Sequence, residues 1–345
     1  MLFKVANVSQ LGQFDEIIDV RSPAEFAEDH IPGAINCPVL DDEERIRVGT
    51  LYKQVSPFEA RKVGAALAAK NIARHIEESF ADRPKSWRPL ICCWRGGQRS
   101  GSMALIFAQI GWPAHQLEGG YKAYRRQALQ WLDELPGQLK LRVICGPTGS
   151  GKSRLLQALA RAGHQVLDLE GLANHRGSVL GRLPDLPQPP QKWFDTLLLQ
   201  QMRGLDLERP VFIESESKKV GFVSLPDALY RQMHQGDCLL LEVPLAERVR
   251  FLLKDYDFYL QDPEALMRQL GFLKGLHSGE QLEAWNQLIR AGHFDTLVAE
   301  LLAKHYDPLY YRSLGKHYPQ LATTAPLMLD SLAPERLDLA AARII

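Results

Sequence analysis

The sequence predicts an α/β protein of two domains, each with a mainly parallel sheet covered by helices. Its 345 residues are more than twice the length of a typical domain of about 150. Short apolar runs, typical of buried strands, alternate with stretches of helical periodicity. A Pro-Gly pair within Asp133–Gly137 interrupts the chain between two such series. We therefore expect one domain over residues 1–137 and a second over residues 138–345.

The first domain is expected to hold short strands and intervening helices. Apolar runs predict strands, and the run that contains Pro38 reads as a strand end or loop. Apolar residues at helical spacing predict helices before and after the second strand. The expected elements are strands at Glu16–Val20 and Pro89–Cys93, a strand end at Ile35–Val39, and helices at Phe58–Ile76 and Ser100–Ile110.

The second domain is expected to open on a strongly apolar strand and to become helical toward its C-terminal part. The predicted strands are Leu139–Cys145, Gln165–Leu169, Pro210–Ile213 and Asp237–Val243. A proline-rich surface loop is expected at Leu183–Pro190. The predicted helices are Ser153–Ala162, Leu245–Tyr256, Pro263–Leu270, Gly279–Ala291 and Phe294–His305.

Composition excludes several classes of protein. Hydrophobic residues make up 46% and charged residues 24%, which excludes disordered and collagen-like chains. The 41 basic and 41 acidic residues balance, so any contact with nucleic acid must come from a local patch. Five cysteines without CxxC spacing indicate a reducing compartment. With no export signal and no apolar run of about 18 residues, we expect a soluble, cytoplasmic protein without a membrane partner.

A cysteine ends the second strand of the first domain and opens the run CWRGGQRSG. Backbone N–H groups that turn inward before a helix form an anion-binding nest, which favours a reactive thiolate. Cys93 is the expected nucleophile, whereas Cys92 faces the opposite side of the strand and is expected to be inert. The active loop comprises Trp94, Arg95, Gly96, Gly97, Gln98, Arg99 and Ser100, with both arginines adding positive charge.

This part of the chain resembles the rhodanese family. Asp19–Pro23 (DVRSP), Glu25-Phe26 and His30–Ala34 (HIPGA) match its first signature, and Leu117–Tyr121 (LEGGY) matches its closing signature. The resemblance covers about Val5 to Trp131 and implies that Cys93 carries a chalcogen as a persulfide or its selenium analogue.

Five residues separate Cys93 from Arg99, a longer loop than sulfur-carrying rhodaneses usually have. It resembles the loop of rhodanese-fold phosphatases. We expect a wider pocket, suited to a phosphate-sized or selenium-bearing group rather than to simple thiosulfate chemistry.

The run GPTGSGKS follows a predicted strand and opens a predicted helix, as the phosphate-binding loop requires. Backbone N–H groups and the helix dipole hold phosphate oxygens, Lys152 neutralises their charge and the Ser153 hydroxyl ligates Mg²⁺. No dedicated metal centre is predicted. The loop resembles that of tRNA prenyltransferases, so an allylic diphosphate competes with ATP as its ligand. The phosphate-binding residues are Gly146, Thr148, Gly149, Ser150, Gly151, Lys152 and Ser153.

Charged residues near the ends of the following strands are further candidates. Glu214 and Glu216 come directly after a predicted buried strand, where a magnesium-side carboxylate is expected, with Glu214 preferred. Asp168 lies near the end of the predicted strand Gln165–Leu169 and is a weaker candidate for the same role. His175 and Arg176 could close on a phosphate or an RNA base, although an ordinary turn explains them equally well. Arg248 and Arg250 could reach over the phosphate site, but surface arginines are usually only solvated.

The order of a rhodanese domain, GPTGSGKS and IESES resembles the tRNA 2-selenouridine synthase family along essentially the whole chain. The resemblance implies that the sulfur of wobble 2-thiouridine is geranylated from geranyl diphosphate. Selenophosphate then supplies the selenium that displaces the alkylated sulfur. The implied partners are tRNA, at the wobble position of its anticodon, and an enzyme that produces selenophosphate.

The residues that would contact tRNA or the prenyl chain are weakly marked. Candidate RNA contacts are the cluster of Lys122, Arg125 and Arg126 and the tyrosine-basic stretch Tyr306–Tyr318, whose aromatics could stack on bases or turn to the core. Trp193, Phe194 and Leu197 could line a channel for the chain, although core packing explains them better.

Two other functions remain open from the residues. One is a rhodanese-fold phosphatase fused to a P-loop kinase, which the long cysteine loop favours. The other is a binding module in which ATP occupancy senses the redox state of Cys93.

Overall fold

The computed structural model describes residues 3–318, 321 and 324–344, and the chain forms two compact units. The division falls between Trp131 and Leu132, inside the helix α5 (Gly120–Glu134), whereas the sequence analysis places the boundary after residue 137. Pro136 and Leu139 are buried, and Gln232 Nε2 donates a hydrogen bond to the Leu139 carbonyl at 3.0 Å. The segment before residue 138 thus packs with the second unit.

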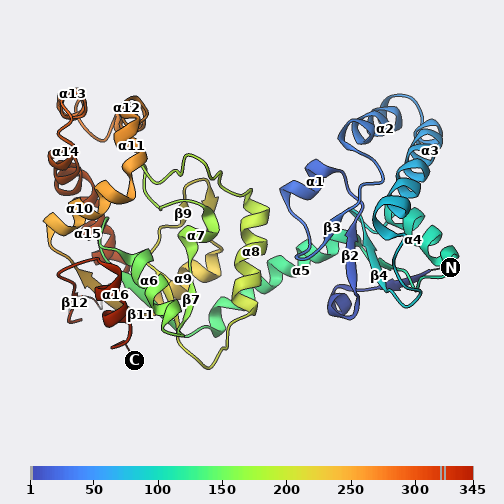
Figure 1. Ribbon diagram of the computed structural model, residues 1–345, viewed down its shortest axis with the longest axis horizontal. Coiled ribbons are helices and arrows are strands. Elements are labelled where there is room, and N and C mark those ends of the chain that lie inside the picture. Colours follow the sequence, from blue (N-terminus) through green and yellow to red (C-terminus); the bar gives the residue numbers. More distant parts are fainter. Residues whose placement is uncertain (1–2, 319–320, 322–323, 345) are drawn as a thin grey trace. The chain divides into compact units, whose positions relative to one another are not determined.

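The first unit contains a five-stranded parallel sheet with the strand order β1-β5-β4-β2-β3 (Figure 1). The predicted strands in this unit are confirmed, and the three-residue strands β1 and β5 escaped prediction because they are too short to show periodicity. All four residues of the central strand β4 are buried. The strands are β1 (Lys4–Ala6), β2 (Glu16–Asp19), β3 (Ile35–Asn36), β4 (Pro89–Cys92) and β5 (His115–Leu117).

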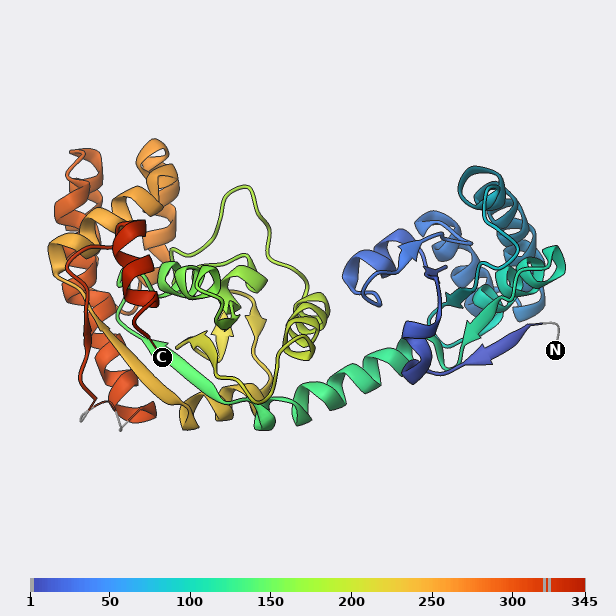
Figure 2. The same ribbon diagram turned by 60° about the horizontal axis from the view of Figure 1, so that its bottom comes forward.

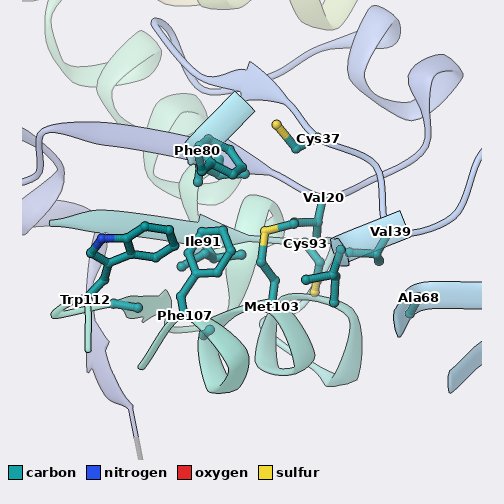
Figure 3. Packing of buried hydrophobic residues seen from close by; sticks show 14 of the residues in the cluster. Val20, Cys37, Val39, Ala68, Phe80, Ile91, Cys93, Met103, Phe107 and Trp112 are labelled. Carbon is teal, nitrogen blue, oxygen red and sulfur yellow. The ribbon is translucent and has the colours of Figure 1, made fainter. Parts of the chain in front are cut away.

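Helices cover this sheet and enclose an apolar core. The helices predicted before and after β4 are confirmed as α3 and α4. The core brings Phe107 and Trp112 to one end and Cys93 and Val39 toward the other (Figure 3). The helical elements of the unit are η1 (Val8–Gln13), α1 (Pro23–Glu28), α2 (Asp42–Gln54), α3 (Pro57–His75), η2 (Ile76–Phe80), α4 (Gln98–Ile110) and α5.

A buried charged network joins the two signature segments of the first unit. Arg21 is paired with Asp19 at 2.6 Å, and both side chains are almost completely excluded from solvent. The Arg21 guanidinium lies 3.9 Å from the centre of the Tyr121 ring and donates to the Asp29 carbonyl. The Tyr121 hydroxyl donates to Asp29 Oδ2 at 2.5 Å. The network therefore fixes the start of α5 against the loop that follows β2.

The second unit contains another five-stranded parallel sheet, in the order β12-β11-β6-β8-β7. The four strands predicted here are confirmed, and β12 was not foreseen because it has only two residues. The strands of the unit are β6 (Leu141–Cys145), β7 (Gln165–Leu167), β8 (Val211–Glu214), β11 (Asp237–Glu242), β12 (Leu327–Met328) and the antiparallel pair β9 (Lys219–Val220) and β10 (Val223–Ser224).

The C-terminal part of this unit is helical, and Figures 1 and 2 both show α10 to α14 gathered on one side of it. Trp285 is fully buried at the centre of their apolar core. The helix predicted over Phe294–His305 is interrupted, since α14 ends at Leu301 and one π-helical turn follows.

The helical elements of the second unit are η3 (Pro136–Gln138), α6 (Lys152–Arg161), α7 (Leu169–Ala173), α8 (Gln191–Arg203), α9 (Asp227–Gln235), α10 (Leu245–Asp255), α11 (Asp257–Gln261), α12 (Pro263–Leu270), η4 (Gly271–Leu273), α13 (Gly279–Arg290), α14 (Phe294–Leu301), η5 (Leu302–Tyr306), α15 (Asp307–His317) and α16 (Pro334–Ala341).

We expect Asp19→Ala to destabilise the first unit by about 3–5 kcal/mol, because it leaves the Arg21 guanidinium buried without its carboxylate. Hydrogen exchange of the β2 and β4 amides during urea unfolding of the full chain measures the effect. The matched control is Asp15→Ala, which breaks an exposed pair with Arg88 and costs at most about 1 kcal/mol. Equal losses for the two variants would contradict the assigned role of the buried pair.

Candidate functional sites

The thiol of Cys93 lies at the base of the loop that joins β4 to α4. The Gly97 N–H donates to its sulfur at 3.3 Å, and the Ser100 hydroxyl donates at 3.1 Å. Gln116 Nε2 donates to Ser100 Oγ at 2.8 Å, so the one hydroxyl hydrogen of Ser100 is shared between the sulfur and the Gly97 carbonyl at 3.3 Å. Cys93 is only 3% exposed, yet its sulfur faces two donors as well as the apolar core. Such donors stabilise charge on an anionic sulfur.

The start of α5 is hydrogen-bonded to the cysteine loop. The Tyr121 N–H donates to the Cys93 carbonyl at 2.8 Å, and the Lys122 N–H donates to the Trp94 carbonyl at 3.0 Å. Gly120 has φ +59°, and a Cβ there would lie 2.2 Å from the Cys93 carbonyl oxygen. Only glycine allows this approach of the two backbones. The closing signature of the first unit is thus part of the cysteine site.

Two arginines of the cysteine loop are expected to add positive charge, and their surroundings differ. Arg99 pairs with Glu25 at 2.6 Å. Burial acts to raise the pKa of Glu25, but the Arg99 guanidinium holds this pKa below its ordinary value. The Arg95 side chain is exposed and has no hydrogen bond or ion pair within the described part of the chain. An anion at this loop would therefore meet Arg95.

The remaining residues of the cysteine loop mainly pack against neighbouring parts of the first unit or lie on its surface. The Trp94 ring lies 5.5 Å from the Tyr121 ring, and Gln98 begins α4 on the surface. Gly96 has φ +64°, and a Cβ there would lie 2.6 Å from the Leu117 carbonyl oxygen. Cys92 is completely buried, and burial raises the pKa of its thiol well above the ordinary value, in line with an inert cysteine.

The basic cluster predicted on α5 is only partly exposed. Lys122 and Arg126 lie on the surface, whereas Arg125 turns toward Asp29 at 3.9 Å. The surface available to a phosphate backbone is therefore smaller than the sequence suggests.

The phosphate loop of the second unit connects β6 to α6 as predicted. Gly149 and Gly151 adopt left-handed backbone conformations, with φ +79° and +75°. Lys152 Nζ donates to the Gly146 carbonyl at 2.8 Å, and the Gly146 N–H donates to the Tyr310 hydroxyl at 2.6 Å. The loop residues from Thr148 to Ser153 line a cavity of about 480 Å³, here called the phosphate cavity. The sequence-predicted anion cradle thus opens into a real cavity.

The acidic wall of the phosphate cavity differs from the sequence prediction. Glu214, the preferred magnesium-side residue, is fully buried, accepts the Leu169 N–H at 3.1 Å and does not line the cavity. Burial raises its pKa well above the ordinary value. Glu216 and Asp168 do line the cavity. The structure does not support the preference for Glu214, because all four residues of β8 are buried and the Leu169 N–H holds this carboxyl group away from the cavity.

Sequence reasoning missed Glu170, which lines the phosphate cavity and accepts the Ser153 hydroxyl at 2.6 Å. Burial raises the pKa of Glu170. Burial and the nearby Glu170 raise the pKa of Glu216 to about 8. The signal that could have found Glu170 is its place two residues after Asp168, just beyond β7, where the carboxyl ends of parallel strands bind ligands.

A magnesium ion is compatible with this wall. The described residues contain no group of three or more His, Cys, Asp or Glu side chains arranged to hold a metal. Magnesium at phosphate loops, however, takes one or two protein ligands and completes its shell with phosphate and water oxygens. The Ser153 hydroxyl and the Glu170 carboxylate, which are hydrogen-bonded to each other and both line the cavity, fit that need.

Arg176 and His175 line the phosphate cavity. Arg176 pairs with Asp255 at 2.9 Å, and its guanidinium lies 4.6 Å from the centre of the Tyr256 ring. Burial lowers the pKa of His175, whose Nδ1 has no hydrogen-bond partner among the described residues. Both residues therefore belong to the site rather than to an ordinary surface turn.

Arg248 and Arg250 do not reach over the phosphate cavity. Arg248 is 5% exposed and donates to the Thr148 carbonyl at 2.7 Å while pairing with Asp307 at 2.6 Å. It ties the phosphate loop to α15. Arg250 pairs with Glu247 on the surface of α10. Neither side chain lines the cavity, because the helix geometry turns Arg248 under the loop and Arg250 outward.

Aromatic side chains from α9 and α15 form another wall of the phosphate cavity. The His234 and His317 rings are stacked at 4.6 Å, and Tyr230 meets His234 edge-on at 4.3 Å. Tyr310 and Tyr318 also line the cavity, whereas Tyr311 points to solvent. The tyrosine-basic stretch therefore contributes to the phosphate site itself. Trp193, Phe194 and Leu197, the weak candidates for a chain channel, do not line this cavity; Phe194 is fully buried in α8.

The two sites define the class of protein: a thiol-bearing rhodanese-like domain joined to a phosphate-loop domain. Family models agree, with a rhodanese-like domain matching residues 5–127 and the "tRNA 2-selenouridine synthase AAA domain" matching residues 139–278. The chain belongs to the tRNA 2-selenouridine synthase family, as its relatives also show.

Three curated relatives bear the name tRNA 2-selenouridine synthase. The protein of Nitrosomonas europaea is 37% identical, over 70% of this chain and 63% of its own length. That of Sulfurovum sp. is 39% identical, over 70% and 65%. That of Cronobacter sakazakii is 36% identical, over 74% and 67%. The chain thus spans less than two thirds of the length of the first two relatives in these matches.

None of the helices in the described part of the chain combines the length and the apolar character that a membrane span requires.

We expect Glu216→Gln to reduce the loss of stability at high pH. A carboxyl group whose folded-state pKa is raised stabilises the fold below its unfolded-state pKa, and this contribution is lost as the pH rises toward about 8. Calorimetric unfolding at pH 5 and pH 9 should show a decline for the variant that is smaller than that of the parent by more than about 1 kcal/mol. The control is Glu208→Gln, at an exposed carboxylate. Parallel pH profiles for the parent and Glu216→Gln would exclude a buried proton on Glu216.

Proposed function

We propose that the chain replaces the sulfur of wobble 2-thiouridine in tRNA by selenium, through an S-geranyl intermediate. Geranyl diphosphate and selenophosphate are its proposed co-substrates. The observation that carries the proposal is that one chain of this family holds both a thiol with two hydrogen-bond donors and a cavity built on a phosphate loop. Each site suits one of the two steps.

The phosphate cavity suits the alkylation step. The thiouridine sulfur attacks the first carbon of geranyl diphosphate, the C–S bond forms, and the C–O bond breaks with its electron pair leaving on pyrophosphate. Lys152 and the loop N–H groups neutralise that charge as it develops. The uridine ring loses its N3 proton, and Glu216, which lines the cavity, would accept it when ionised. If Mg²⁺ accompanies the diphosphate, Ser153 and Glu170 would hold it, and it would supply further charge neutralisation.

The Cys93 loop suits the selenium step. Arg95 offers an uncompensated positive charge to the selenophosphate anion, beside the Cys93 sulfur. Selenium attacks C2 of the alkylated base, the C–S bond breaks, and the geranyl thiolate leaves with the electron pair. The Cys93 thiolate then attacks the phosphorus, the S–P bond forms, and the P–Se bond breaks with its electron pair staying on selenium; water hydrolyses the S–P bond and releases phosphate. Alkylation makes the sulfur a better leaving group, which is the chemical reason for two steps.

Recognition of tRNA is supported by the aromatic wall. Unstacked RNA bases bind on aromatic side chains, and Tyr230, His234 and His317 line the cavity that the phosphate loop opens into. Exposed Lys122 and Arg126 would contact the phosphate backbone. A cytoplasmic location and a supply of selenophosphate from a separate enzyme complete the proposal.

The experiment that tests this function is mass spectrometry of tRNA nucleosides after incubation with the protein, geranyl diphosphate and selenophosphate, each omitted in turn. Selenouridine should form only when both are present, and S-geranyl-thiouridine should accumulate without selenophosphate. Hydrolysis of aryl phosphates, with no change in tRNA, would instead support a phosphatase–kinase fusion. Tight ATP binding with no change in tRNA would support the redox-sensing module.

We expect Cys93→Ser to abolish selenouridine formation while S-geranyl-thiouridine still accumulates, because the thiol belongs to the first unit and the phosphate cavity to the second. The nucleoside assay measures both products. Cys238→Ser, which removes a thiol outside the cysteine loop, is the control and should retain both steps. Loss of geranylation in Cys93→Ser would refute the separation of roles.

We expect Lys152→Ala to lower the rate of geranylation by at least about a hundredfold, since the departing pyrophosphate loses its cation. Single-turnover assays with 2-thiouridine tRNA measure the rate. Lys140→Ala removes an exposed lysine of the same unit, which pairs with Glu208, and should leave the rate unchanged. Unchanged geranyl transfer by Lys152→Ala would show that the loop does not hold the diphosphate.

A further inference from the structure

A second cavity adjoins the phosphate loop and is enclosed by apolar side chains of the helical region. It has a volume of about 60 Å³ and is here called the apolar cavity. Its walls include Leu266 of α12, Phe294, Leu297 and Leu301 of α14, and Leu260 of α11. Most of these side chains belong to the core around Trp285. An apolar cavity of this kind does not hold water well and favours a hydrocarbon group.

The apolar cavity and the phosphate cavity share wall residues. Thr148 of the phosphate loop, Ser178, Leu252 and Tyr256 line both. Leu252 also lies directly over the loop, since a Cβ on Gly149 would be 2.9 Å from Leu252 Cδ1. The two cavities are therefore adjacent, and only these shared side chains lie between phosphates on Lys152 and Ser153 and the apolar surroundings.

The volume of the apolar cavity limits what it can hold. One water-sized group needs about 10–15 Å³ of cavity volume, so the 60 Å³ of the apolar cavity accommodates about four to six heavy atoms. One isoprene unit has five carbon atoms. The carbons nearer to the diphosphate would lie at the shared wall beside the Tyr256 ring.

We propose that the apolar cavity binds the terminal isoprene unit of the allylic diphosphate and thereby selects a ten-carbon chain. This inference rests on the proposed function, because it takes an allylic diphosphate as the ligand of the phosphate cavity. A five-carbon chain leaves the apolar cavity empty, and a fifteen-carbon chain exceeds its volume. Leu266 and Leu301 are then specificity-determining residues that take no part in the chemistry.

The test compares dimethylallyl, geranyl and farnesyl diphosphates with 5, 10 and 15 carbons as donors to 2-thiouridine tRNA. The parent protein should prefer geranyl over dimethylallyl at least about tenfold, as expected for burial of five carbon atoms. Leu266→Phe, which fills the cavity, should lower this preference at least about fivefold while dimethylallyl transfer persists. Leu266→Ala, which enlarges the cavity, should raise the farnesyl-to-geranyl ratio. Leu339→Phe and Leu339→Ala, at an exposed position on α16, are the matched controls.

Calorimetric binding separates this inference from the proposed function. Geranyl diphosphate should bind the parent protein at least about tenfold more tightly than inorganic pyrophosphate, and Leu266→Phe should remove most of that difference. Pocket-dependent binding without any prenyl transfer would refute the proposed function and support the apolar cavity as the chain site. Prenyl transfer with donor ratios and affinities that do not change in either Leu266 variant would overturn the assignment of the cavity. Should Leu266→Phe fail to fold, Leu266→Ala decides the question alone.

Discussion

Each unit depends on the same backbone arrangement, in which a buried parallel strand ends, the chain turns within a few residues and a helix begins with its N–H groups facing the turn. In the first unit this turn places the Gly97 N–H on the Cys93 sulfur, and in the second it forms the loop around Lys152. Amides in such turns need no proton transfer and no side-chain entropy to hold an anion. The chemistry of both sites therefore begins with backbone geometry, and the side chains refine it.

Charge is then balanced differently in the two sites. At the cysteine loop, Arg99 forms an ion pair with Glu25 and thereby organises the loop. The exposed Arg95 is available to a ligand. In the phosphate cavity, Lys152 and Arg176 face Glu170 and Glu216, whose pKa values are raised by burial. A bound diphosphate adds negative charge to this wall. A bound cation or protonated carboxyl groups would offset that charge.

The helical region does more than complete the second unit. Arg248 and Asp307 tie α10 and α15 to the Thr148 carbonyl, and Tyr310 accepts the Gly146 N–H. Helices α10, α11, α12 and α14 enclose the apolar cavity, and α15 carries His317 into the aromatic wall. Diphosphate, hydrocarbon chain and base would thus each meet a different surface around one loop.

The sequence by itself determined both α/β units, the loop that begins at Cys93 and the phosphate loop, since these follow from local patterns: apolar runs, glycines that permit a tight turn, and a lysine at a helix start. It did not determine which charged side chains face a ligand. Glu214 is buried while Glu170 lines the cavity, and Arg248 lies under the loop, because these outcomes depend on the packing of α7, α10 and α15 against the sheet. Only tertiary structure decides them, since residues distant in sequence compete for the same space and the same carbonyl oxygens.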